Sequence, residues 1–252
     1  MKLSLPRGLI ALTLATLAFS ARAGEIQVAV AANFSAAAQK IAAQFEHDTG
    51  NTVKLSFGAT GKFYAQITAG APFDVLLAAD QSAPEKLVAE GKGIAATRHT
   101  YAIGKLVLWS ADPALVDRDG DVLKSTQWKH LSVADAKLAP YGQAAKETLA
   151  QLKLTDAVQS RVVTAENIGQ AYQFVQTGNA ELGFVALGQV QPPDGSPVRG
   201  SMWLVPDNLY TPIRQDAVVI AASKARAAAT AFVDYLASDK ARVVIKAYGY
   251  SW

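Results

Sequence analysis

Four stretches of the chain could hold an anion, because each places small or amide residues directly before the start of an expected helix. The stretches are Ala31-Ala32-Asn33, Gly58-Ala59-Thr60-Gly61, Ala139-Pro140-Tyr141-Gly142 and Glu166-Asn167-Ile168-Gly169. The first turn of a helix carries backbone N–H groups without an intrahelical acceptor, together with a partial positive charge. Four such helix starts that converge would form an anion-binding site without any charged side chain.

Each stretch contributes one candidate oxyanion-binding residue. Asn33 follows small alanines that leave room for a ligand to approach the backbone, and a simple helix N-cap is the alternative interpretation. Thr60 can donate from its hydroxyl and from its N–H, and it too could be only a cap in a glycine-rich turn. Tyr141 offers an N–H or a phenol, unless it is a core side chain. Ile168 has an apolar side chain, so only its N–H could bind.

Other chemistries lack their usual sequence signatures. The chain has no cysteine, which excludes disulfides, thiolate nucleophiles and cysteine-based metal sites. Its three histidines, His47, His99 and His130, are not paired at helical spacing with another metal ligand. Neither a G-x-S-x-G nucleophile turn nor a Walker A phosphate loop is present. We therefore expect a binding protein rather than an enzyme, with no resident cofactor and no directly bound metal ion.

The first 23 residues have the pattern of a secretory signal peptide. Lys2 and Arg7 supply a basic start, residues 8–20 are almost wholly apolar, and Ala21-Arg22-Ala23 matches a cleavage site. A buried helix is the alternative, but the segment is too short to span a membrane. We expect cleavage before Gly24 and a periplasmic location.

The expected mature chain is electrically balanced. The full chain has 24 basic and 21 acidic residues, and the signal segment removes three basic residues, which leaves 21 of each. This balance gives no indication of a polyanion-binding surface, so we expect no nucleic-acid partner. A chain of about 230 residues can build a hydrophobic core without disulfides, as one large or two small domains.

Strand and helix patterns alternate along the expected mature chain, which predicts an α/β fold. Strands are expected at residues 25–30, 52–56, 74–78, 101–109, 131–134, 161–163, 181–187, 202–205 and 216–221. Helices are expected at residues 34–48, 61–69, 81–90, 143–153, 168–176, 224–236 and 240–247. No linker separates consecutive domains, so a discontinuous arrangement is predicted: residues 24–104 plus 209–252 form one lobe, and residues 105–208 form the other. The four helix starts follow strand ends, where such sheets bind ligands.

These residues also carry a family resemblance. The segments that carry it are Val28-Ala29-Val30-Ala31-Ala32-Asn33-Phe34, Ser56-Phe57-Gly58-Ala59-Thr60-Gly61, Ala69-Gly70-Ala71-Pro72-Phe73-Asp74-Val75, Ala78-Ala79-Asp80, Ala145-Lys146-Glu147, Ala165-Glu166-Asn167-Ile168, Leu182-Gly183-Phe184-Val185 and Tyr248-Gly249-Tyr250. With them the chain closely resembles the periplasmic molybdate-binding proteins of ABC transporters, over essentially the whole expected mature length. The resemblance implies a two-lobed periplasmic binding protein of type II, in which each lobe is a mostly parallel sheet flanked by helices. In that family the lobes close on a tetrahedral oxyanion held by neutral donors.

Matching the family's motifs places the oxyanion contacts at Asn33, Thr60, Tyr141 and Ile168. Asn33 and Thr60 stand where many members have serine, and Tyr141 stands where some have alanine. Another binding tyrosine of some members falls near Ala186, which has no hydroxyl, and Tyr141 could substitute for it from a different direction. The resemblance also implies a transient complex with an inner-membrane ABC permease, and we expect a monomer.

The expected donors favour molybdate or tungstate as the ligand. Both are full dianions at neutral pH, so each oxygen accepts hydrogen bonds and none donates. Phosphate carries a proton at neutral pH and needs an acceptor, and none of the four positions supplies a carboxylate. Sulfate is also a dianion and must be excluded by size. Two alternatives stay open from the sequence: a binder of another tetrahedral oxyanion such as sulfate, and a secreted hydrolase.

Overall fold

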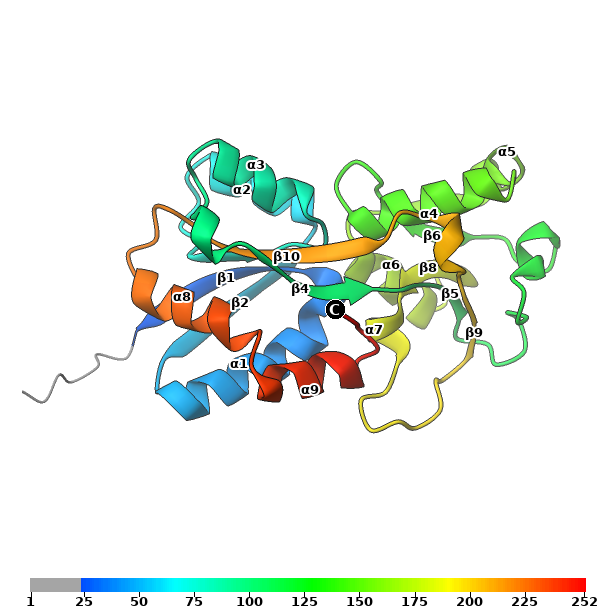
Figure 1. The fold of residues 1–252 in the computed structure, drawn as a ribbon. Coiled ribbons are helices and arrows are strands. Elements are labelled where there is room, and N and C mark those ends of the chain that lie inside the picture. Colours follow the sequence, from blue (N-terminus) through cyan, green and yellow to red (C-terminus); the bar gives the residue numbers. More distant parts are fainter. Residues whose placement is uncertain (1–23) are drawn as a thin grey trace, which may run out of the picture.

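The structure is a computed structural model that describes residues 24–252, so the expected signal peptide at residues 1–23 lies outside the described residues. In this part the chain forms two five-stranded sheets that lie side by side, each covered by helices (Figure 1). The expected α/β class is confirmed. None of the helices between residues 24 and 252 combines the length and the hydropathy of a membrane span.

Each sheet mixes parallel and antiparallel pairings. The first sheet has the order β2-β1-β3-β10-β4, with β1 (Glu25–Ala31), β2 (Thr52–Gly58), β3 (Val75–Leu77), β4 (His99–Gly104) and β10 (Ile213–Val219). The second has the order β7-β6-β8-β5-β9, with β5 (Leu106–Ser110), β6 (Leu131–Ala134), β7 (Val162–Ala165), β8 (Leu182–Ala186) and β9 (Ser201–Leu204). Two pairings in each sheet are parallel and two are antiparallel. The sheets are therefore mixed rather than mostly parallel, because β5 and β10 enter from the other half of the molecule and run against their neighbours.

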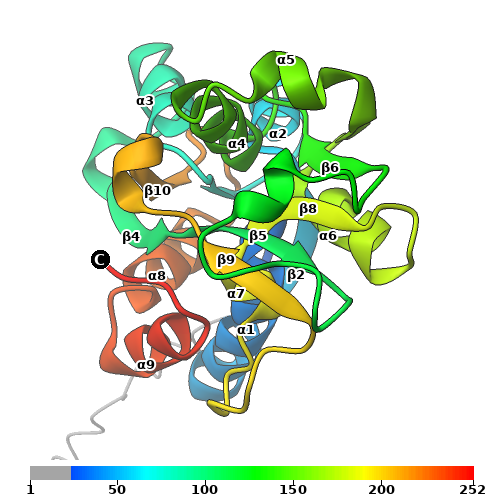
Figure 2. The same ribbon diagram turned by 90° about the vertical axis from the view of Figure 1, so that its right-hand side faces the viewer.

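Helices cover both faces of each sheet (Figures 1 and 2). In the first half, α1 (Ser35–Thr49), α8 (Arg226–Tyr235) and α9 (Asp239–Ala247) lie on one face, and α2 (Thr60–Thr68) and α3 (Ser82–Ala89) lie on the other. In the second half, α4 (Pro140–Gln151) and α5 (Thr155–Val158) lie on one face, and α6 (Ile168–Gln176) and α7 (Leu187–Val190) lie on the other. Side chains alternate between the faces along β1: Val28 packs in the same cluster as Phe45 of α1, whereas Ala29 packs with Phe63 of α2.

The chain passes between the two sheets twice (Figure 1). β4 ends at Gly104 and β5 begins at Leu106, so only Lys105 separates strands of different sheets, and the return runs from β9 through residues 205–212 into β10. The prediction of a single strand at residues 101–109 is therefore wrong, since this segment forms two strands in different sheets. A continuous run of extended, apolar residues does not reveal which sheet each part joins. A glycine is needed at this crossing, since a Cβ on Gly104 would lie 1.9 Å from the Tyr141 hydroxyl oxygen.

Candidate anion-binding site

The four helix starts meet at one small cavity between the two halves. Its lining consists of Asn33, Thr60, Tyr141 and Ile168 together with the small residues Ala31, Ala32, Gly58, Ala59, Ala79, Ala139 and Pro140. The structure thus brings all four candidate residues together, and their role as anion ligands stays a prediction. None of these lining side chains is charged. The cavity volume is about 10 Å³, which is close to the room that one water-sized sphere needs.

The first half contributes Thr60 and Asn33 to the cavity. Thr60 opens α2 and is 1% exposed, and its Oγ1 accepts a hydrogen bond from the Ala79 N–H at 3.0 Å. The Thr60 hydroxyl therefore keeps its own proton for an acceptor in the cavity. Asn33 lies in a single 3₁₀ turn (Ala32–Phe34) between β1 and α1 and is buried. Neither side chain caps its helix, so the capping interpretation does not account for these two residues.

The second half contributes Tyr141 and Ile168. Pro140 occupies the first position of α4 and has no N–H, so the Tyr141 N–H is the first donor of that helix. Ile168 opens α6 after Asn167, whose Oδ1 accepts a hydrogen bond from the Gln170 N–H at 3.0 Å. This cap serves a later amide and leaves the Ile168 N–H in the first turn, where no intrahelical acceptor exists. Both halves thus bring first-turn amides to the cavity.

A buried hydrogen-bond network behind the cavity joins the two halves. Gln215 of β10 is fully buried, and its Oε1 accepts from Asn33 Nδ2 at 2.8 Å and from the Tyr101 hydroxyl at 3.1 Å. The Gln215 Nε2 donates to the Tyr141 hydroxyl oxygen at 3.3 Å. The Tyr250 hydroxyl donates to the Asn33 carbonyl oxygen at 2.7 Å. The Tyr141 phenol, which the sequence left as one of two possible donors, therefore reaches the crossing between the sheets.

Burial keeps the phenols of this network neutral. Desolvation raises the pKa of Tyr101 and of Tyr141 well above the usual tyrosine value of about 10, and nearby phenols add to the effect. Desolvation also raises the pKa of Tyr250, against the opposing hydrogen bonds with Asn33 and Tyr141. Sequence reasoning missed Gln215 and Tyr101, because neither lies at a helix start or in a charge cluster. Tyr250 carried a signal only as part of the motif at the chain end.

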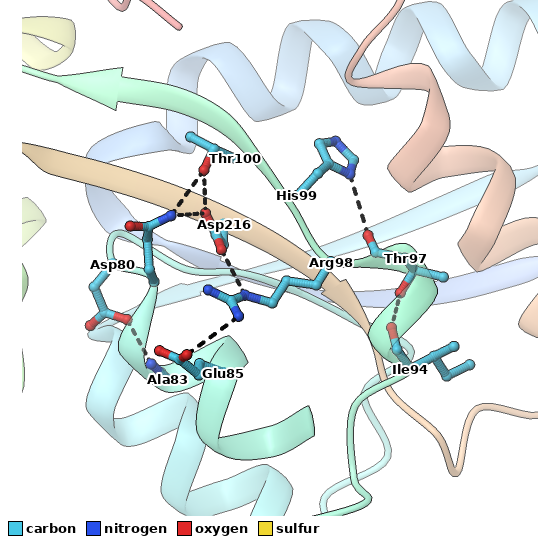
Figure 3. Close-up of polar contacts among 10 residues, drawn as sticks. Asp80, Ala83, Glu85, Ile94, Thr97, Arg98, His99, Thr100 and Asp216 are labelled. Carbon is cyan, nitrogen blue, oxygen red and sulfur yellow. Dashed lines mark hydrogen bonds and ion pairs between the residues drawn. The ribbon is translucent and has the colours of Figure 1, made fainter. Parts of the chain in front are cut away.

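The carboxylate that follows Gln215 is neutralised by its own partners (Figure 3). Asp216 is buried and accepts hydrogen bonds from Arg98 Nε at 2.8 Å and from the Thr100 hydroxyl at 2.7 Å. Gln81 Nε2 donates to the same carboxylate at 3.2 Å. Asp216 is not among the residues that line the cavity, so its charge stays outside while its bonds hold β10 beside the site.

Direct contacts hold the two halves together beside the cavity. The Gly61 N–H donates to the Leu138 carbonyl oxygen at 2.9 Å, and Lys62 Nζ lies 2.6 Å from Glu166 Oε1. A Cβ on Gly61 would lie 3.1 Å from Leu138 Cα, so any larger residue would require the two backbones to move apart by a few tenths of an ångström. Lys62 and Glu166 are both about half exposed, so their ion pair adds little stability.

Ala186 occupies the position near which some members of the resembling family have a tyrosine, and it is fully buried. Its N–H donates to Gln189 Oε1 at 2.9 Å, and Gln189 Nε2 donates to the Ile168 carbonyl oxygen at 3.1 Å. A neutral amide thus supports the helix start at Ile168. Among residues 24–252, no group of three or more histidine, aspartate or glutamate side chains is placed to hold a metal ion.

Comparisons with known proteins agree with one another. Residues 26–251 match the family model described as bacterial extracellular solute-binding protein. The chain is 58% identical over 250 residues to the molybdate-binding protein ModA of Azotobacter vinelandii, covering 99% of each chain. It is 50% identical over 234 residues to ModA of Rhodobacter capsulatus, covering 93% of this chain and 91% of the relative. The solved periplasmic molybdate-binding protein of Azotobacter vinelandii matches with a TM-score of 0.88 at 42% identity, covering 90% of this chain and 99% of that chain.

Proposed function

We propose that this chain, which belongs to the bacterial extracellular solute-binding proteins and within them to the periplasmic molybdate-binding proteins of ABC transporters, captures molybdate or tungstate for an ABC importer. One observation carries the proposal: helix starts from both halves meet at a cavity that no charged side chain lines. First-turn amides and a free hydroxyl proton suit a small anion. The relatives are binding proteins, and the protein is a binding protein rather than an enzyme.

The available donors favour a fully deprotonated oxyanion. Thr60 supplies an O–H, Tyr141 and Ile168 supply first-turn N–H groups, and no lining residue supplies a carboxylate. Molybdate and tungstate have only acceptor oxygens at neutral pH, which suits such a site. Phosphate retains a proton that would have no charged acceptor, so we expect it to bind poorly. Sulfate has shorter bonds, so a cage set for the larger ion leaves its hydrogen bonds stretched.

Binding requires the two halves to move. The four candidate residues are each at most 3% exposed, so an ion reaches the cavity only when the halves separate, and the halves then close on it. We propose that residues 24–104 plus 209–252 and residues 105–208 are the two lobes, which turn about the crossings at Lys105 and before β10. The proposal includes a signal peptide at residues 1–23, a periplasmic monomer, and recognition of the closed form by an inner-membrane permease.

Thermal unfolding and calorimetry with four oxyanions test the function. A ligand that binds only the folded state raises the melting temperature, and at a thousandfold excess over Kd it stabilises by about 4 kcal/mol. We expect a large rise with molybdate and with tungstate, little or none with sulfate, and none with phosphate. A rise with sulfate alone would identify a sulfate binder. No rise with any of the four would refute the proposal.

A further inference from the structure

One buried atom of the site lacks a partner. Asn33 Oδ1 makes no hydrogen bond within residues 24–252, although Asn33 is 2% exposed and lines the cavity. The two N–H groups of Asn33 Nδ2 are taken by Gln215 Oε1 at 2.8 Å and by the Tyr250 hydroxyl oxygen at 3.3 Å. In this arrangement the Asn33 side chain can offer an anion only an acceptor, which a fully deprotonated oxyanion cannot use.

The contacts around Gln215 also include more acceptor oxygens than protons to occupy them. The Tyr101 hydroxyl has one proton and two acceptors within reach, the Ala78 carbonyl oxygen at 3.0 Å and Gln215 Oε1 at 3.1 Å. Only one of these two bonds can form at a time, so one close contact between oxygens stays without a proton. The other end of the Gln215 amide donates to the Tyr141 hydroxyl oxygen.

A half rotation of both carboxamides removes both defects. Gln215 Nε2 would then donate to Asn33 Oδ1 and to the Tyr101 hydroxyl oxygen. The Tyr101 hydroxyl would still donate to the Ala78 carbonyl oxygen. Gln215 Oε1 would accept the proton of the Tyr141 hydroxyl. The one hydrogen bond lost is that from Asn33 Nδ2 to the Tyr250 hydroxyl oxygen at 3.3 Å. The Tyr250 hydroxyl still donates to the Asn33 carbonyl oxygen. Asn33 Nδ2 would then replace Oδ1 on the side of the cavity and could donate to a bound anion.

We propose that Gln215 is a positioning residue that turns the side-chain N–H of Asn33 toward the bound anion. The inference rests on the proposed function, because it concerns the same cavity. Gln215 can do this because it is fully buried and contacts Asn33 of the first half and Tyr141 of the second. Closure of the halves brings the Tyr141 hydroxyl to Gln215 Oε1, so closure and the orientation of Asn33 become coupled. Tyr141 then serves the anion through its N–H.

Three variants test the assignment by calorimetric titration with molybdate. In its ionised form Gln215→Glu presents only acceptors, so it bonds to Asn33 Nδ2 and leaves Oδ1 on the cavity side. Together with the added negative charge, this should lower the affinity about a hundredfold or more. Gln215→Met cannot orient Asn33 at all, and we expect about a tenfold loss. Gln39→Glu is the charge control: it lies in the groove beside Ala32, outside the network, and should stay within about threefold of wild type. Wild-type affinity in Gln215→Met would overturn the inference.

A second measurement follows the Asn33 side-chain amide itself and does not depend on whether Gln215→Glu folds. In ¹H–¹⁵N spectra the side-chain signals of Asn33, assigned by their loss in Asn33→Asp, should shift and exchange more slowly with water when molybdate saturates the wild-type protein. The same signals in Gln215→Met should respond less, which a purely structural role of Gln215 would not cause. A wild type that binds molybdate with unchanged Asn33 signals refutes this inference alone. A wild type that binds no oxyanion refutes the proposed function.

Discussion

Replacing Thr60 by valine tests directly whether a helix start binds the anion. The substitution exchanges the hydroxyl for a methyl group of similar size and leaves the backbone N–H at the start of α2 in place. Two hydrogen bonds are at stake. One is accepted by Thr60 Oγ1 from the buried Ala79 N–H at 3.0 Å, and the other would be donated by the Thr60 proton to the anion. The two bonds have separable consequences.

The loss of affinity follows from the donated bond. A hydrogen bond to a charged group contributes about 1.5–3 kcal/mol, and about 1.4 kcal/mol changes Kd tenfold. Thr60→Val should therefore weaken molybdate binding by roughly ten- to a hundredfold. The lost acceptor leaves the Ala79 N–H unpaired, which should lower the free energy of unfolding by about 1–3 kcal/mol. In a chain of this size each kcal/mol lowers the melting temperature by roughly 2–4 °C.

Titration with molybdate and thermal unfolding without ligand measure the two effects separately. Thr60→Ser is the matched control, because it keeps the hydroxyl and should stay near wild type in both measurements. If Thr60→Val melts earlier but binds molybdate as tightly as wild type, Thr60 only holds Ala79, and the argument that its proton faces the anion is refuted.

Three further predictions concern the contact between the halves, the buried ion pair and pH. Gly61→Ala places a Cβ 3.1 Å from Leu138 Cα, so molybdate titration should show at least about a threefold loss of affinity with little change in melting temperature; full affinity would mean that closure does not need this approach. Arg98→Met leaves the buried Asp216 carboxylate without its cationic partner and should lower the free energy of unfolding in urea by about 3 kcal/mol, and a loss below about 1 kcal/mol would contradict this. Burial raises the pKa of Tyr210 to about 12, so the folded state holds this proton more tightly than the unfolded chain, whose tyrosines titrate near about 10. The contribution of Tyr210 to the free energy of unfolding is complete below about pH 10 and is lost as the pH rises through about 12. The free energy of unfolding in urea should therefore be lower at about pH 11 than at about pH 8, and equal values would count against this prediction.

The starts and ends of helices could be predicted because their signals act over a few residues. Gly50 ends α1 with a left-handed φ of 74°, Asn167 caps α6, and Ser238 caps α9 by accepting a hydrogen bond from the Ala241 N–H at 3.2 Å. Each effect depends on the residue's own conformation or on a neighbour along the chain. The four helix starts proposed for anion binding could be predicted for the same reason.

The crossing between the sheets could not be predicted in this way. Residues 101–104 and 106–109 are both apolar and extended, and periodicity treats them alike. Their assignment to different sheets depends on pairing, since Gly104 faces Ile213 of β10 whereas Leu106 faces Ala186 of β8. Such partners lie far away in the sequence, so the local pattern contains no information about them.

The amino-acid sequence alone specified the family, the α/β class and the positions of the small and amide residues at the helix starts, because these follow from local chemistry and shared motifs. Tertiary packing was needed to establish which donors meet. Gln215 and Asn33 are 182 residues apart, and Tyr250 and Asn33 are 217 residues apart, yet each pair is joined by a hydrogen bond. A hydrogen bond needs its two heavy atoms within about 3 Å, and only the packing of both sheets and their helices brings such distant groups that close.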